Sequence, residues 1–180
     1  MQKRKLENIQ KKVKGFDYSL DYNTIDFREH PELYQIGKGE QGVLLVEPYK
    51  SELLPFWRFK TPEIAEKSAH KIYKLFLKYK KEKDFVGMDM ARKFLQMGYT
   101  RSRRYANHKS GKKYEGPVPI EHRGESGSHG RKILSLDVDE NKAICATFFY
   151  EKWQLAKNDI VYKKLKEKHL KSTSDFVRSA

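Results

Sequence analysis

Cysteine is nearly absent from the sequence, which holds Cys145 alone among its 180 residues. A single thiol excludes an internal disulfide framework and any zinc site built from several thiolates. We therefore predict a reducing, cytoplasmic location, and we interpret Cys145 as a small core residue.

Long apolar runs are missing as well. No stretch approaches the roughly 20 apolar residues that a membrane-spanning helix needs. The N-terminal segment, MQKRKLENIQKKVKGF, also lacks the apolar run of a secretory signal. The sequence thus predicts no membrane partner and no export.

Acidic residues are outnumbered, since 24 Asp and Glu stand against 38 Lys and Arg, which gives a net charge of +14. This excess favours a polyanionic partner, above all nucleic acid, and leaves an acidic protein as an alternative partner. With 38% hydrophobic residues the chain still has enough apolar material for a core. We expect one domain over residues 16–171, with a basic arm at 1–15 and a flexible tail at 172–180.

No strong catalytic signature is present. Gly37, Gly39 and Gly42 share the spacing of a dinucleotide-binding loop, but they precede a predicted strand, whereas that fingerprint follows a strand and opens a helix. We interpret these glycines as a turn into a buried strand, and we keep as an alternative that their amides help to hold an anion. No cofactor is expected.

Three helices are predicted from their caps and apolar stripes. Thr61 and Asp84 cap predicted helices at 61–81 and 84–107, and the short break between them indicates an antiparallel pair. Asp139 caps a third, which ends among lysines near residue 168. The predicted inner face of this third helix comprises Ile144, Phe148, Phe149, Trp153, Ala156 and Ile160.

Strands are predicted at 43–46 and 133–138, and a strand or a bulky wedge against the core at 56–59, because these residues are β-branched, aromatic or alternating. Residues 110–132 are rich in glycine and charge, and so form a loop. The predicted fold class is α+β: a mainly helical single domain with a few short strands and a long basic, glycine-rich loop.

The end of the second helix and the loop after it are the strongest candidate for a site. Arginine pairs bidentately with phosphate, and the interspersed tyrosines can stack on bases. The alternative is a solvated helix end. The predicted nucleic-acid or phosphate-binding residues are Arg101, Arg103, Arg104, His108, Lys109, Lys112, Lys113, Arg123, His129 and Arg131.

Histidines in the same region offer a second chemistry. A histidine acting as general acid or base beside these arginines would make the loop an enzyme site for nucleic acid or a phosphorylated small molecule. A metal site is not expected, because the spacings of 14 and 7 residues between His108, His122 and His129 match no zinc pattern.

Three segments resemble a known family: FDYSLDYNTIDFREHPELY, IGKGEQGVLLVEPYKSELLPFWRFKTPEIA and DFVGMDMARKFLQMGYTRSRRYANHKSGKKY. The family comprises small cytoplasmic proteins of bacteria and phages and is classed as a domain of unknown function. The resemblance covers about residues 16–160. It implies a single intracellular domain and assigns no activity, cofactor or site residue.

The sequence therefore favours nucleic-acid binding through phosphate contacts. An enzyme that uses the same basic loop is the alternative, followed by a module that binds an acidic protein. The choice between DNA and RNA stays open.

Overall fold

The computed structural model describes residues 16–122, 125 and 127–179. The predicted basic arm at 1–15 and Arg123 therefore lie outside the described residues. The helices in chain order are η1 (Pro31–Leu33), α2 (Tyr49–Leu53), η2 (Leu54–Phe56), α3 (Pro62–Lys81), α4 (Phe85–Asn107), η3 (Ile120–His122), α5 (Glu140–Asn158) and α6 (Ile160–Ser179).

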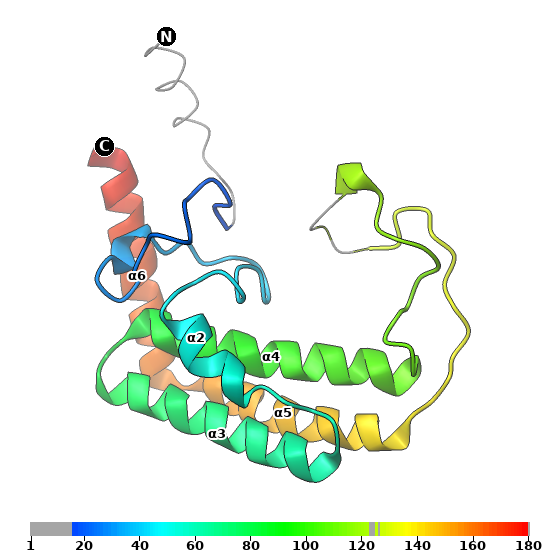
Figure 1. Cartoon of the computed structure of the whole chain (residues 1–180). Helices are drawn as coiled ribbons and strands as arrows, with labels where there is room; N and C mark the ends of the chain where they lie inside the picture. Colours follow the sequence, from blue (N-terminus) through cyan, green and yellow to red (C-terminus); the bar gives the residue numbers. More distant parts are fainter. Residues whose placement is uncertain (1–15, 123–124, 126, 180) are drawn as a thin grey trace.

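Helix α4 is the centre of the molecule. Helices α3 and α5 pack along it in the opposite direction, and α6 stands across their ends (Figure 1). The first three turns of α4 are buried on all sides, as the fully buried Met90, Phe94 and Leu95 show. The predicted antiparallel pair is confirmed.

The predicted helix starts are also confirmed, each by a side-chain cap. The Thr61 hydroxyl accepts a hydrogen bond from the Ile64 amide at 3.3 Å, and the Asp84 carboxylate accepts one from the Gly87 amide at 2.9 Å. Asp139 caps α5 in the same way. Such caps satisfy amides that the first turn leaves without helical partners.

The predicted length of the third helix is wrong, because the chain forms two helices there, α5 and α6. Asp159 separates α5 from α6; its carboxylate accepts from the Tyr162 amide at 3.0 Å and from Lys80 Nζ at 2.5 Å. The chain therefore turns here, and α6 continues to Ser179. Ile144 and Ile160, predicted to face inward, are 45% and 70% exposed. Of the other predicted inner residues, Phe149 and Ala156 are buried, and Phe148 and Trp153 are half-buried.

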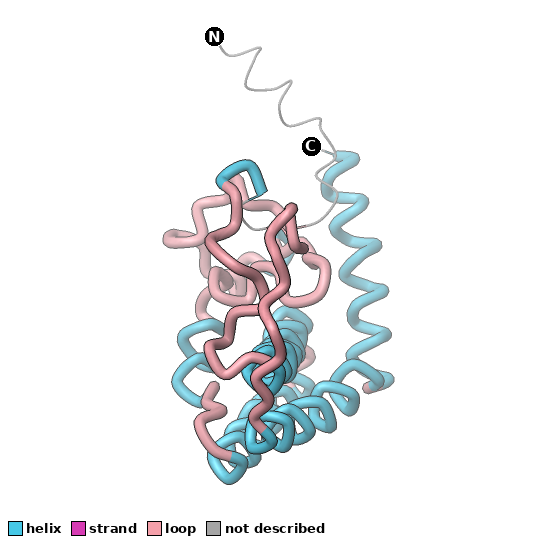
Figure 2. The backbone as a smooth tube through the Cα atoms, turned by 90° about the vertical axis from the view of Figure 1, so that its right-hand side faces the viewer, coloured by secondary structure: helices cyan, strands magenta, loops and turns pink. Residues whose placement is uncertain are grey.

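The predicted α+β class is wrong. The described residues contain no sheet, as the absence of any strand in Figure 2 illustrates, and the fold is all-helical. Residues 43–46 form successive turns, in which the Leu45 amide donates to the Gly42 carbonyl at 3.0 Å. Val43 and Val46 are the buried pair, so the burial repeats every three residues rather than every two.

The other two predicted strands fail for related reasons. Phe56 ends the short helix η2, so residues 56–59 are not a strand. Residues 133–138 form only isolated bridges, Ile133 with Tyr114 and Asp137 with His108. Leu136 is 71% exposed, because no neighbouring strand or sheet covers this alternating segment.

A charged cluster fixes the core around Asp89, which is fully buried in α4. Its carboxylate accepts hydrogen bonds from the hydroxyls of Tyr34 at 2.5 Å and Tyr162 at 2.6 Å, and from Arg92 Nε at 2.8 Å. Burial alone would raise the pKa of Asp89, but the charges of Arg92 and Lys93 outweigh it and hold the pKa well below its usual range. The cluster joins α4 to α6 and to the segment before α2.

No helix in the described part of the chain is both long and apolar enough to cross a lipid bilayer.

Candidate phosphate-binding pocket

We call the segment between α4 and α5, residues 108–138, the basic loop. Its two arms are held together by backbone hydrogen bonds near the helix ends, where the Asp137 amide donates to the Asn107 carbonyl at 2.8 Å. Further out, the Leu134 amide donates to the Lys113 carbonyl at 2.9 Å. From the ends of both helices the loop rises to one side of them, above α4 (Figures 1 and 2). Residues distant in sequence are thereby brought together.

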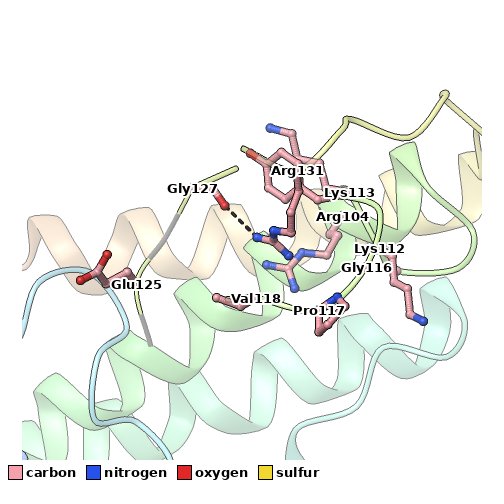
Figure 3. Close-up of a pocket in the computed structure, with 11 residues that line it drawn as sticks. Arg104, Lys112, Lys113, Gly116, Pro117, Val118, Glu125, Gly127 and Arg131 are labelled. Atoms are coloured by element: carbon pink, nitrogen blue, oxygen red, sulfur yellow. Dashed lines mark hydrogen bonds between the residues drawn. The ribbon is translucent and has the colours of Figure 1, made fainter. Parts of the chain in front are cut away.

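A pocket of about 730 Å³ opens between these arms and the end of α4. Figure 3 shows the side chains that surround it. Arg104 comes from the last turn of α4, and both arms of the loop supply the rest. The lining residues are Arg104, Gly111, Lys112, Lys113, Tyr114, Gly116, Pro117, Val118, Glu125, Gly127 and Arg131.

Two cations of the pocket lie at the ring of Tyr114. The Arg131 guanidinium lies 4.8 Å from the centre of the Tyr114 ring, and Lys113 Nζ lies 5.4 Å from it. Arg131 also donates to the carbonyls of Ser128 and Gly127, both at 2.9 Å (Figure 3 draws the Gly127 bond). These bonds hold the guanidinium in place and still leave other N–H groups for a ligand.

The described lining of the pocket carries four cations and one carboxylate, that of Glu125. Among the described residues, no carboxylate forms an ion pair with any of the four lining cations, Arg104, Lys112, Lys113 and Arg131. Partial burial and the neighbouring charge of Arg101 lower the pKa of Arg104, although a guanidinium stays protonated in proteins. Four cations that line one pocket, two of them at the Tyr114 ring, form a site suited to anions, and phosphate in particular.

Four of the predicted site residues therefore converge, and others do not. His108 is buried, with its Nδ1 atom 3.1 Å from the Ser135 carbonyl, so it helps to hold the loop base. Lys109 forms an ion pair with Asp137 at 3.2 Å. Arg101 and Arg103 lie on α4 outside the pocket lining.

His129 belongs to a separate cluster at the edge of the pocket. Its ring stacks on His122, with centroids 4.1 Å apart, and His122 Nδ1 lies 2.9 Å from the Glu125 carboxylate. From the sequence, His122 was considered as a metal ligand together with His108 and His129 and was rejected on its spacing, and Glu125 was not selected. The only local signal was the three-residue spacing of His122 and Glu125, which suits one turn.

The glycine turn at 37–42 does not contribute to the pocket. Its carbonyls, not its amides, face cations: Gly39 accepts from Arg92 at 3.3 Å and Gln41 from Lys93 at 2.6 Å. A Cβ at Gly37 would lie 2.8 Å from the Phe16 side chain, so this glycine is needed for packing. The arrangement supports a turn role and gives no support to the anion-binding alternative.

Most of the chain matches a known family model. The family model described as Domain of unknown function (DUF4385) matches residues 17–172. The chain belongs to this family. The family match includes every pocket residue and extends into α6, so the basic loop lies within the family domain. Searches of the curated proteins and of the solved structures found no match.

Proposed function

We propose that this protein binds nucleic acid through its phosphate groups, with the basic pocket as the principal contact. The observation that carries the proposal is the set of four cations that line the pocket, two of them at the Tyr114 ring, with no ion pair to a carboxylate among the described residues. A phosphate would neutralise charge that the described part of the protein leaves unbalanced, and Arg131 is already oriented by two carbonyls.

The proposed site includes no recognised base-reading motif. Contacts to phosphate position a protein on nucleic acid without reading its sequence. We therefore propose binding with little sequence preference, supplemented by the exposed lysines on α3 and by the net charge of +14. A bacterial or phage origin and a cytoplasmic location, where nucleic acid is the abundant polyanion, belong to the same proposal.

Salt dependence tests the proposal. Fluorescence anisotropy of labelled single- and double-stranded DNA and RNA of equal length, with a chelator present, gives the affinity at 50 and 200 mM salt. Four phosphate contacts predict that affinity falls by about a hundredfold over this range for duplex DNA. Absence of binding to every polymer at the lower salt would overturn the proposal, and an acidic peptide tested in parallel would then address the alternative partner.

A second candidate function is an enzyme acting on nucleic acid or on a phosphorylated small molecule at the same site. The observation in its favour is the concave shape of the pocket together with the histidine cluster that shares Glu125 with it. Incubation with a nucleic-acid substrate and with a phosphorylated small molecule, followed by product analysis, tests it. Turnover that disappears in a pocket variant would favour the enzyme.

A further inference from the structure

The cluster of His122, Glu125 and His129 has the composition of a metal site. One ligand atom from each residue lies within 4.8 Å of the other two. His122 comes from η3 and His129 from the returning arm of the basic loop, so the loop fold brings the two imidazoles together. Neither imidazole is on a helix longer than one turn.

His129 carries a second, independent indication. Its Nε2 atom is buried and has no hydrogen-bond partner among the residues that the structure describes. A buried polar atom without a partner costs free energy, on the order of 1–3 kcal/mol, and such atoms often mark a missing ion or ligand. His129 also has a φ of 46°, a left-handed backbone conformation that is uncommon for a residue other than glycine.

We propose that His122, Glu125 and His129 bind a divalent transition-metal ion, with Zn²⁺ as the preferred ion. Two imidazoles and one carboxylate form a donor set known from zinc sites that keep a fourth position open. Imidazole nitrogen disfavours Mg²⁺, which prefers oxygen ligands and retains its water. The site is assigned from these three residues alone and does not rest on nucleic-acid binding.

Binding requires one change from the observed arrangement. The two rings are 15° from parallel at a centroid separation of 4.1 Å, whereas a nitrogen lone pair lies in the plane of its own ring. One imidazole must therefore turn out of the stack for both nitrogens to reach the same ion. The Glu125 carboxylate, now 2.9 Å from His122 Nδ1, would move from that hydrogen bond to the metal.

The location suggests a role for the open position. Glu125 also lines the basic pocket, so a bound ion would lie at the edge of that pocket. Lys113 and Arg131 line the same pocket, and their charges would repel the bound metal ion. An anion between these two residues and the metal would attract both sides and so offset the repulsion. We therefore expect the metal and a phosphate monoester to bind with positive coupling, each raising the affinity for the other.

Calorimetric titration tests the site. The full chain, first treated with a chelator and desalted, is titrated with ZnCl₂ at neutral pH, and separately with CoCl₂ while visible absorption is recorded. The expected results are one Zn²⁺ per chain and a ligand-field spectrum of Co²⁺ with fewer than six ligands. Titration with MgCl₂ under the same conditions should give no binding at this site.

Matched variants separate this site from surface histidines. His122→Asn and His129→Asn should each weaken Zn²⁺ binding by at least about tenfold, since a lost ligand of this kind is rarely replaced. His70→Asn, which changes an exposed histidine of α3, should leave it unaltered. Circular dichroism confirms that each variant is folded. Equal affinity in all three variants, or no binding by the unchanged protein, would overturn the proposal.

The coupling is tested by repeating the Zn²⁺ titration with a nucleoside monophosphate present. Tighter Zn²⁺ binding supports a shared site, and unchanged binding overturns the coupling while leaving the metal site in place. Nucleic-acid affinity in the presence of chelator is a separate measurement, so failure of the metal site and failure of nucleic-acid binding are distinguishable.

Discussion

Lys93 donates a 2.6 Å hydrogen bond from its ammonium group to the backbone carbonyl of Gln41. The Lys93 side chain is fully buried in α4, and its only nearby anion among the described residues is Asp89, whose carboxylate lies 3.9 Å away. This bond attaches the glycine turn to the middle of the core. A cation that sequence alone would place among the basic surface residues is therefore an internal cross-link.

The buried ammonium makes stability depend on pH in a particular direction. Burial lowers the pKa of Lys93 to about 8, although the charge of Asp89 opposes the shift. The ordinary pKa of a lysine side chain, taken here for the unfolded chain, is 10.5. Between these values the unfolded state binds more protons, so the contribution of Lys93 to the free energy of unfolding rises with pH, by at most about 1.4 kcal/mol per unit. Below pH 8 the contribution is constant.

Urea denaturation at intervals from pH 7 to 9.5 measures this rise. Lys93→Met should be less stable than the unchanged protein at every pH and should lack the additional rise above pH 8. The upper limit avoids the tyrosines, because burial raises the pKa values of Tyr34 and Tyr162, which then reduce stability only above about pH 10. Parallel curves for the two proteins would show that Lys93 does not titrate in this window.

Gly98→Ala should destabilise the protein, although alanine is the better helix former by about 1 kcal/mol. A Cβ at Gly98 in α4 would lie 2.2 Å from the Phe149 ring of α5, so the contact between these two helices has no room for it. We expect a loss of about 1–3 kcal/mol, measured by urea denaturation. Arg103→Ala, at an exposed position of the same helix, serves as control and should change stability by less than about 0.5 kcal/mol.

Gly39→Ala tests whether the glycine turn is structural. Gly39 has a φ of 62°, where any side chain is strained, and the nearest atom to a new Cβ is Gln96 Nε2 at 3.4 Å. The variant should therefore lose about 1 kcal/mol through backbone strain alone. Its affinity for oligonucleotides should be unchanged, because Gly39 does not line the pocket. Weakened binding in a stable variant would assign the turn to the ligand site after all.

The position of the charge should matter more than its amount. Replacing Lys112, Lys113 and Arg131 by glutamine should weaken oligonucleotide binding at low salt by about tenfold or more, since these residues converge on one pocket. The matched triple variant replaces Lys67, Lys74 and Lys81, which are exposed along α3. It removes the same charge and should weaken oligonucleotide binding by less than about threefold. Anisotropy titrations of both at one salt concentration compare them, and a larger loss from the α3 variant would reject the pocket as the principal contact.

The sequence by itself determined the features that depend on neighbours along the chain. Thr61, Asp84 and Asp139 each cap a helix through an amide three residues ahead, so their roles can be predicted from local spacing. The apolar residues of α4 repeat often enough to predict a buried helix with both ends correctly placed.

Only the tertiary structure decided which segments with strand propensity would pair with another strand and which cations would lie close together. Residues 43–46 have strand propensity, but they form turns whose two valines join the core, because a strand needs a neighbour to satisfy its backbone groups. Arg131 and Lys113 meet at Tyr114 through hydrogen bonds between the two arms of the basic loop. Such contacts depend on loop closure and on packing between residues far apart in the sequence. These long-range contributions to the folding free energy produce no periodic pattern in the sequence.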